Sequence, residues 1–496
     1  MNTNTFDLHS SHYKALRMKK LFLPVLLLIS LLSHAQSVEG YFESIRNNEA
    51  RLTAFMQLMP KGGDLHHHYT GSVYAETYVQ AVIAKDFWIN PAYLMVMDTK
   101  PDTGKYWVRF SSLPASDIPA LKEALMTKWS VKNYNGTDPP SDKQFFNAFG
   151  YFSPATRISV DNGLLELKKR AQSEQVSYIE TMFMTIDNRK TDLGNCTSVN
   201  DQLRKAARGK EEEKVARILD SLFKVVMAKD GALCAKTFND SIARQHKRLM
   251  IDDATFTLRY MNYVSRNSEP ADVIKGLVIA FESANTSPLI VGVNLVAPEN
   301  GEVSMKDYWL HMQMLKFCHS KFPAVNISLH AGELVMGMVK PEELTWHIGS
   351  AVWEGHAQRI GHGVDIAYEK DCYGLLGYMS KNNIAIEINL FSNEFILKVK
   401  DGAHPFSMYR DFNVPILICT DDAGILRSDL TRQYVLLAMR YKDVTYENIK
   451  SYVYNSMRYS FIKEPVVKKA LETKLDNAFR SFEGTILQLS KPGGTH

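Results

Sequence analysis

Three consecutive histidines near the start of the chain have the residue type and spacing of metal ligands. His66, His67 and His68 lie in the run Asp64–Ser72 and belong to the predicted strand Gly63–Tyr69. Because side chains alternate between the two faces of a strand, His66 and His68 point one way and His67 the other. Two neutral imidazoles on one face can share a metal ion, and zinc, iron and nickel all accept imidazole. The motif predicts either a metal site or a histidine-rich turn or surface tract.

Three further motifs follow apolar segments, at the positions where barrel enzymes keep their sites. The first ends at His330 and is followed by Glu333, whose carboxyl could donate a proton if burial raised its pKa. The second places His362 between two glycines, which allow close backbone approach. The third ends in Asp421 and Asp422, and burying adjacent carboxylates is costly unless each has a partner. A helix cap, a core histidine and a solvated Asp–Asp turn are the respective alternatives.

The motifs together predict a centre for one metal ion, with zinc as the expected metal. Three histidines and one carboxylate form a ligand set that leaves a position open for water. The metal lowers the pKa of that water and yields hydroxide near neutral pH. The predicted ligands of this single Zn²⁺ are His66, His68, His330 and Asp421.

The elements that must position these residues alternate between strands and helices. Eight apolar segments are predicted strands: Gly63–Tyr69, Val176–Met182, Phe256–Tyr260, Leu289–Leu295, Asn326–His330, Arg359–Gly363, Ile384–Asn389 and Pro415–Thr420. Helical patterns lie between most of them, and Glu211–Met227 carries an apolar stripe at helical spacing. This alternation predicts an α/β fold, a (β/α)₈ TIM-type barrel with additional helical insertions over the barrel mouth.

The sequence predicts one barrel domain that follows an N-terminal signal peptide. Residues 1–35 combine a basic start, an apolar run and a small-residue cleavage site, which is typical of a signal peptide, here with an N-terminal extension. An uncleaved anchor helix is the alternative. We expect an N-terminal helical segment at 36–58 and a single domain at 59–490, with insertions at about 71–175 and 184–250. The protein is then exported, to the periplasm or the exterior, with no membrane association after cleavage.

The net charge and the cysteines bear on the possible partners, disulfides and metal sites. The net charge is +4, and residues 1–35 carry +3 of it, so the remainder is nearly neutral and has no footprint for nucleic acid. Exported chains can form disulfides, and Cys196 and Cys234, which flank a polar stretch, are the candidate pair. Cys318 and Cys419 lie in apolar contexts and are expected to be buried thiols. Without a C-x-x-C spacing, a cysteine zinc site is not expected.

In this order, the motifs resemble those of the adenosine deaminase family, and more closely its secreted branch, the adenosine deaminase growth factor-like proteins. The similarity runs from about Pro60 to Phe461. The segments that carry it are Met59–Gly63 before the His-x-His strand, His330–Glu333, Gly361–Gly363, Ser392–Asn393 and Thr420–Asp422.

The resemblance implies zinc-dependent hydrolytic deamination of adenosine, and of 2′-deoxyadenosine, to inosine and ammonia. Glu333 would protonate purine N1 while hydroxide generated on the zinc attacks C6. His362 would orient or deprotonate the attacking water, and Asp422 would contact purine N7. Protonation of N1 makes C6 electrophilic enough to accept hydroxide. The expected partner is a small nucleoside, and the secreted branch adds the expectation of a homodimer.

The expected substrate-binding residues are Thr70, Gly71, Ala297 and Asp422, and here the chain departs from the family pattern. Thr70 stands where the common pattern has an Asp thought to hold the ribose 5′-hydroxyl. Ala297 replaces a glycine; its N–H could reach purine N3, but its methyl group crowds the site. Asn389–Phe391 replaces the usual Cys-Pro before Ser-Asn. We therefore expect sugar recognition to differ from that of the relatives.

Four other functions share part of this pattern. A deaminase of another adenine-containing compound would keep the same catalytic residues. A binuclear lactonase or cyclic amidase usually needs a carboxylated lysine at a middle strand end, and no lysine is well placed. A cytidine-deaminase-type enzyme would need H-x-E and P-C-x-x-C, which are absent. A secreted signalling or binding protein of the same fold would be expected to have lost ligands or the acid.

Overall fold

The structure is a computed structural model that describes residues 1, 37–101, 106–136 and 138–490. The expected signal peptide therefore lies outside the described residues, Met1 excepted. Within the described ranges no helix is long and apolar enough to cross a membrane.

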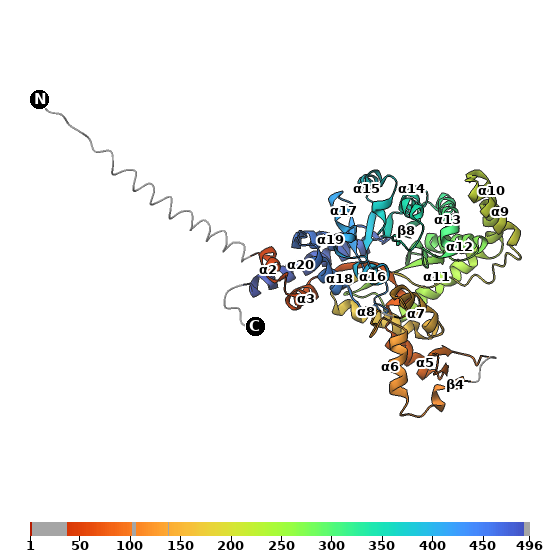
Figure 1. The fold of residues 1–496 in the computed structure, drawn as a ribbon, viewed down its shortest axis with the longest axis horizontal. Helices are drawn as coiled ribbons and strands as arrows, with labels where there is room; N and C mark the ends of the chain where they lie inside the picture. The colour runs from red at the N-terminus through yellow and green to blue at the C-terminus, as the bar shows by residue number, and fades with distance from the viewer. Residues whose placement is uncertain (2–36, 102–105, 137, 491–496) are drawn as a thin grey trace.

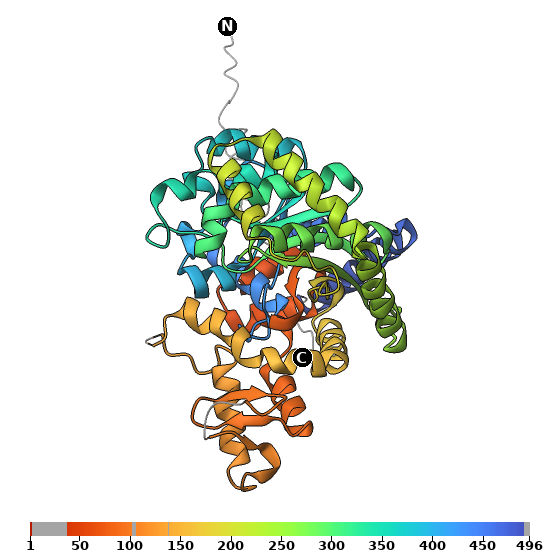
Figure 2. The same cartoon turned by 90° about the vertical axis from the view of Figure 1, so that its right-hand side faces the viewer.

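Eight parallel strands form the predicted barrel in the described part of the chain (Figures 1 and 2). In sheet order they are β1 (Gly62–His68), β5 (Val176–Met182), β6 (Thr257–Ser265), β7 (Ile290–Val296), β8 (Asn326–Ala331), β9 (Arg359–His362), β10 (Ala385–Ile388) and β11 (Ile416–Ile418). The ring closes just after β11, because Asp421 N donates to His66 O at 2.9 Å and His68 N donates to Asp421 O at 3.2 Å. The predicted fold is confirmed, and every predicted strand overlaps an observed one.

Helices connect the strands and cover the outside of the barrel. In chain order they are α8 (Val160–Ser173), α9 (Thr197–Arg208), α10 (Glu212–Ala228), α11 (Gly231–Arg248), α12 (Pro270–Thr286), α13 (Glu302–Lys321), α14 (His347–Trp353), α15 (Cys372–Lys381), α16 (Leu390–Leu397), α17 (Phe406–Asp411) and α18 (Leu430–Arg440). Short 3₁₀ helices occupy Phe110–Ser112, Arg157–Ser159, Pro341–Thr345, Ile366–Tyr368 and Asp401–Ala403. The helix predicted at Glu211–Met227 is α10, and its apolar stripe is buried at Val215, Leu219, Leu222 and Val226.

The insertion after β1 is mostly helical, as expected, but it also contains a small sheet. Its helices are α4 (Tyr69–Ser72), α5 (Ala75–Ala84), α6 (Ile118–Lys128) and α7 (Ser141–Thr156), and its antiparallel strands are β2 (Trp88–Asn90), β3 (Met95–Met97) and β4 (Val108–Arg109). The Asn90 side chain accepts from the N–H groups of Ala92 and Tyr93, which turns the chain from β2 back into β3. Figures 1 and 2 show α5, α6 and this sheet projecting away from the barrel.

The ends of the described chain pack together on one side of the barrel. The predicted N-terminal helical segment forms two helices, α2 (Val38–Ile45) and α3 (Glu49–Leu58), which meet α19 (Tyr446–Arg458) and α20 (Pro465–Leu489). The segment is divided into two helices because Asn48 caps the start of α3. Its side chain accepts a hydrogen bond from Arg51 N at 3.1 Å. The Phe55 ring lies edge-on to Phe482, with centroids 5.0 Å apart, and this contact fastens α3 to α20.

The cysteines are all free thiols, so the candidate Cys196–Cys234 disulfide is wrong. The two thiols have different neighbours: Cys234 Sγ lies 3.6 Å from Thr191 Oγ1, and Cys196 Sγ lies 3.8 Å from Leu193 O. Cys318 and Cys419 are buried, as expected.

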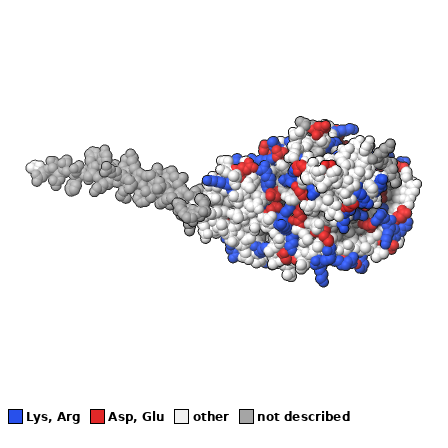
Figure 3. All heavy atoms as spheres, turned by 90° about the horizontal axis from the view of Figure 1, so that it is seen from below, with Lys and Arg blue, Asp and Glu red and all other residues white. Residues whose placement is uncertain are grey.

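Charged side chains are interspersed on the face of the molecule in Figure 3. Lysines and arginines alternate there with acidic residues, and neither sign forms an extended field on that face. This mixture agrees with the small net charge left after residues 1–35.

Candidate functional site

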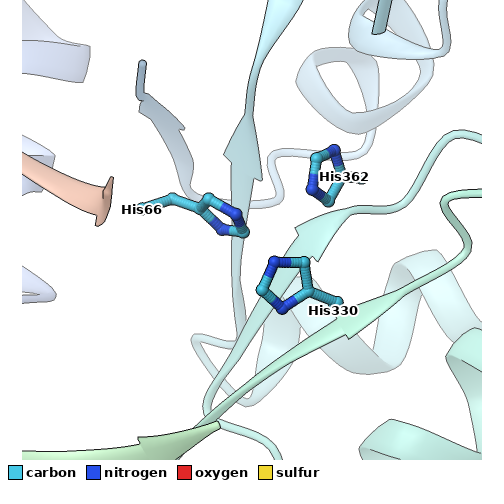
Figure 4. A group of neighbouring side chains, drawn as sticks. All are labelled: His66, His330 and His362. Carbon is cyan, nitrogen blue, oxygen red and sulfur yellow. The ribbon is translucent and has the colours of Figure 1, made fainter. Parts of the chain in front are cut away.

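The carboxyl ends of the strands meet around a cavity of about 350 Å³ at the barrel mouth. Eight of the sequence-predicted site residues line it: His68, Thr70, Ala297, His330, Glu333, His362, Asp421 and Asp422. His66 is fully buried beside them, and Figure 4 shows its ring close to those of His330 and His362. Gly71 faces Asp422, since a Cβ atom on Gly71 would lie 1.5 Å from Asp422 Oδ1. The structure thus brings all the predicted site residues together.

The three consecutive histidines alternate as predicted. The Nε2 atoms of His66 and His68 lie 3.6 Å and 3.3 Å from Asp421 Oδ1, inside the barrel. His67 points the other way, with Nδ1 2.9 Å from Thr181 Oγ1. His67 therefore supports the barrel wall.

The four predicted ligands converge closely enough to hold one metal ion. His68 Nε2 lies 3.0 Å from His330 Nε2, in addition to the two distances to Asp421. Ligands at tetrahedral zinc bond lengths stand about 3.3 Å apart, which matches this spacing. His66 Nε2 is buried without a hydrogen-bond partner, an arrangement that is costly unless an ion completes it. The donor set and its geometry fit a metal.

A buried ion-pair chain orients His66. Its Nδ1 lies 2.6 Å from Glu387 Oε2, which leaves Nε2 free to face the other ligands. Arg359 Nε lies 2.7 Å from Glu387 Oε1, and Arg359 Nη2 lies 2.7 Å from Glu180 Oε2. All these side chains are almost fully buried. Glu387, Arg359 and Glu180 were not predicted from the sequence, although a charged residue inside an apolar strand is a signal that could have identified them.

Two further ligands, His330 and Asp421, have neutral partners. His330 Nδ1 lies 2.9 Å from the Asn294 amide oxygen, and Ser392 Oγ donates to Asp421 Oδ2 at 2.6 Å. Burial alone would raise the pKa of Asp421, but the close imidazoles of His66, His362 and His68 outweigh it and hold that pKa well below its usual value. Asp421 is therefore a carboxylate, the form that binds metal.

Glu333 is held in the opposite protonation state. Burial raises its pKa well above the usual range, and the negative charges of Asp421 and Glu299 add to the effect. Its backbone N–H donates to Glu299 Oε2 at 2.9 Å, and the N–H of Gly332 donates to Glu299 Oε1 at 3.2 Å. A neutral carboxyl thus stands at the cavity wall, fixed through its main chain by Glu299, a residue that sequence analysis did not single out.

Three non-glycine residues at the cavity adopt the left-handed backbone conformation: Ala297, His362 and Asp421, with φ of 84°, 71° and 64°. This conformation is unfavourable for residues with a Cβ atom and is concentrated at functional sites. Gly361 has a different role, because a Cβ atom there would lie 2.6 Å from His66 Cε1. The glycine next to His362 is therefore required by the close approach of His66.

A parallel α/β barrel with a histidine and carboxylate cluster at its mouth defines a class of metal-binding barrel proteins. The model of the adenosine deaminase family matches residues 236–478, which include His330, Glu333, His362, Asp421 and Asp422. The chain belongs to the adenosine deaminase family. His66 and His68 precede the matched residues, and the barrel brings them into the same site.

Among curated proteins, an adenosine deaminase from Enterococcus faecalis is 29% identical over 157 residues, covering 32% of this chain and 42% of that protein. An adenosine deaminase from Escherichia coli is 30% identical over 151 residues, covering 30% of this chain and 41% of that protein. The matched region thus spans about two fifths of the length of these relatives.

Solved structures share the fold at low identity. The adenine deaminase from Arthrobacter aurescens superimposes with a TM-score of 0.53 at 14% identity, covering 85% of this chain and 99% of that one. The N6-mAMP deaminase from Arabidopsis superimposes with a TM-score of 0.54 at 16% identity, covering 86% of this chain and 99% of that one. An amidohydrolase from Burkholderia ambifaria with bound Zn superimposes with a TM-score of 0.53 at 15% identity, covering 88% of this chain and 94% of that one. These likenesses support the barrel fold.

Proposed function

We propose that the protein catalyses the hydrolytic deamination of adenosine, and of 2′-deoxyadenosine, to inosine or deoxyinosine and ammonia. The observation that carries this proposal is the pairing of the converged ligand set with the neutral, buried carboxyl of Glu333 in one cavity. Relatives named as deaminases of adenosine, adenine and N6-mAMP support the reaction type.

We propose zinc as the metal, held by His66, His68, His330 and Asp421. Three imidazoles and a carboxylate suit zinc and leave a position open for water. When bound, the zinc lowers the pKa of water and supplies hydroxide near neutral pH. The zinc found in the Burkholderia amidohydrolase supports this choice.

The protein's own residues would bind the purine ring and move the proton. Glu333, kept neutral by burial, donates its proton to purine N1 and so makes C6 electrophilic. Asp422, on the same cavity wall, contacts N7, and the N–H of Ala297 faces N3. Phe145, Phe146 and Phe149, which also line the cavity, would exclude water from the reacting atoms, and this strengthens the polar contacts.

The outer part of the cavity favours an uncharged nucleoside over a nucleotide. Its wall contains Phe145, Phe146 and Phe149 from α7 and Met182 and Tyr263 from the barrel. No lysine or arginine is among the described residues that line this cavity. A phosphate dianion there would lose water without gaining a positive partner, and this is unfavourable. AMP is therefore expected to be a poor substrate.

A substrate panel tests the proposal. Zinc-loaded protein is assayed with adenosine, 2′-deoxyadenosine, adenine, AMP and N6-methyl-AMP, by the loss of absorbance near the adenosine maximum and by release of the amine, which is methylamine for N6-methyl-AMP and ammonia for the others. We expect the two nucleosides to have the highest kcat/KM. Glu333→Gln should keep its zinc and lose at least about a hundredfold in kcat. Turnover of AMP or adenine in preference to adenosine would contradict the assigned substrate, and a fully active Glu333→Gln variant would contradict the assigned acid.

A further inference from the structure

A chain of buried hydrogen bonds outside the ligand set ends on His362. The backbone N–H of Phe406 donates to His404 Nδ1 at 3.1 Å. His404 Nε2 lies 3.1 Å from Asn393 Oδ1, and Asn393 Nδ2 lies 2.9 Å from His362 Nδ1. The three side chains are 3%, 0% and 1% exposed, so water does not compete for these contacts.

The backbone N–H of Phe406 determines which atom donates in each of the later hydrogen bonds. A backbone N–H can only donate, so His404 Nδ1 accepts and carries no proton. Burial lowers the pKa of His404 to about 3, so the ring is neutral and its one proton is on Nε2. That N–H must donate to the Asn393 oxygen, and the Asn393 NH₂ group must then donate to His362 Nδ1.

We infer that His404 and Asn393 are positioning residues that hold His362 with its proton on Nε2, facing the reaction centre. This inference rests on the proposed function for its catalytic meaning. His362 Nε2 is buried, has no hydrogen-bond partner among the described residues, and lies 4.0 Å from Asp421 Oδ2. A nitrogen that already carries a proton cannot take another from water. His362 therefore orients the attacking oxygen as a hydrogen-bond donor and is not its base. The proton of that water would be lost to solvent, since a bound zinc would lower the pKa of the water to near neutral.

Two main-chain hydrogen bonds fix the backbone from which the Asn393 side chain extends. Its backbone N–H donates to Asn389 O at 2.9 Å, and its backbone carbonyl accepts from Val399 N at 3.2 Å. The carboxyl of Glu333 does not compete for His362 Nδ1, because their 3.7 Å separation is too long for a hydrogen bond. Ser392, the residue before Asn393, donates to Asp421. The first turn of α16 thus fixes both Asp421 and His362.

The tautomer can be measured without any turnover. Zinc-loaded protein labelled with ¹⁵N-histidine is examined by NMR, and the His362 signals are assigned with His362→Gln. We expect an unprotonated Nδ1 and a protonated Nε2 on His362, and the same tautomer on His404. A proton on His362 Nδ1 would overturn the inference whether or not the protein deaminates nucleosides.

Variants separate the hydrogen-bond role from packing. In Asn393→Asp, the carboxylate can only accept, so the His362 proton should move to Nδ1, with kcat lower by about a hundredfold or more and KM little changed. His404→Leu removes the donor to Asn393 and should also lower kcat. His404→Gln can still donate and should restore much of that loss.

His246→Leu is the matched control, because His246 is also a buried histidine, with Nδ1 3.0 Å from Tyr260 OH, but lies outside the cavity. It should lower stability and leave kcat unchanged. Equal losses of kcat in His404→Gln and His404→Leu, or full kcat in an Asn393→Asp protein whose tautomer has changed, would overturn the inference.

Discussion

His330 Nδ1 donates to the amide oxygen of Asn294 at 2.9 Å, so a neutral group orients this predicted ligand. His66, in contrast, has the Glu387 carboxylate 2.6 Å from its Nδ1. A carboxylate partner increases the basicity of a ligating imidazole more than an amide does. The Asn294 amide nitrogen is also buried without a hydrogen-bond partner. The Glu387 carboxylate therefore makes His66 a more basic ligand than the Asn294 amide makes His330.

Replacing the amide by a carboxylate should tighten metal binding. Asn294→Asp is expected to raise zinc affinity by about tenfold or more, because the carboxylate strengthens His330 as a ligand. The measurement is the rate of zinc release to a chelator at fixed pH. Glu387→Gln is the reciprocal variant and should release zinc faster. Unchanged release from both variants would show that these partners do not tune the metal.

The contact between Gly71 and Asp422 gives a second prediction. A Cβ atom on Gly71 would lie 1.5 Å from Asp422 Oδ1, so Gly71→Ala must displace that carboxyl. We expect kcat/KM for adenosine to fall by at least about tenfold, since a small misplacement of a substrate contact is costly, while zinc content stays at one per chain. Gly377→Ala, where a Cβ atom meets nothing within 4 Å, is the control. Normal kinetics in Gly71→Ala would contradict the assignment of Asp422 as a substrate-binding residue.

The third prediction concerns the residue that fixes the Glu333 main chain. Glu299 accepts from the N–H groups of Gly332 and Glu333 and lies 2.7 Å from His347 Nδ1. Glu299→Ala leaves buried donors unpaired, so the free energy of unfolding should fall by about 1–3 kcal/mol and kcat should fall as well. Urea unfolding and steady-state kinetics measure the two effects. The nearby exposed Glu302→Gln should change neither, and a Glu299→Ala protein with normal kcat would separate Glu299 from catalysis.

The barrel and the predicted ligands could be inferred from sequence because their signals are local. A strand such as Ile416–Ile418 is buried throughout and appears as a short, wholly apolar run. Alternation along β1 was enough to separate His67 from His66 and His68, as the structure bears out.

The supporting residues could not be inferred, because their contacts join distant parts of the chain. Glu387 lies 321 positions from His66 in sequence, and no periodicity links them. Asn294 lies within β7 and Asn393 within α16, and only the closed barrel shows which histidine each one contacts. The small sheet β2–β4 was missed for a related reason: its strands span only two or three residues each, too short for an alternating pattern to be recognised.

The last prediction is a pH dependence of stability that arises away from the cavity, at Glu174. Burial, with the negative charge of Asp429, raises the pKa of Glu174 from 4.5 to about 7. Between these two values the folded state holds a proton that the unfolded state has released. The free energy of unfolding should therefore fall as pH rises from about 4.5 to 7 and stay lower above that.

Glu174→Gln should remove this contribution while keeping an acceptor for the N–H of Leu430, which lies 3.0 Å from Glu174 Oε2. The variant is expected to match the unmodified protein near pH 4.5 and to be more stable at pH 8. Urea midpoints measured from pH 4.5 to 8 test this, with the exposed Glu213→Gln as the control. A Glu174→Gln curve parallel to that of the unmodified protein at every pH would mean that Glu174 is ionised in the folded state, and that the nearby Arg170 and Lys61 outweigh its burial.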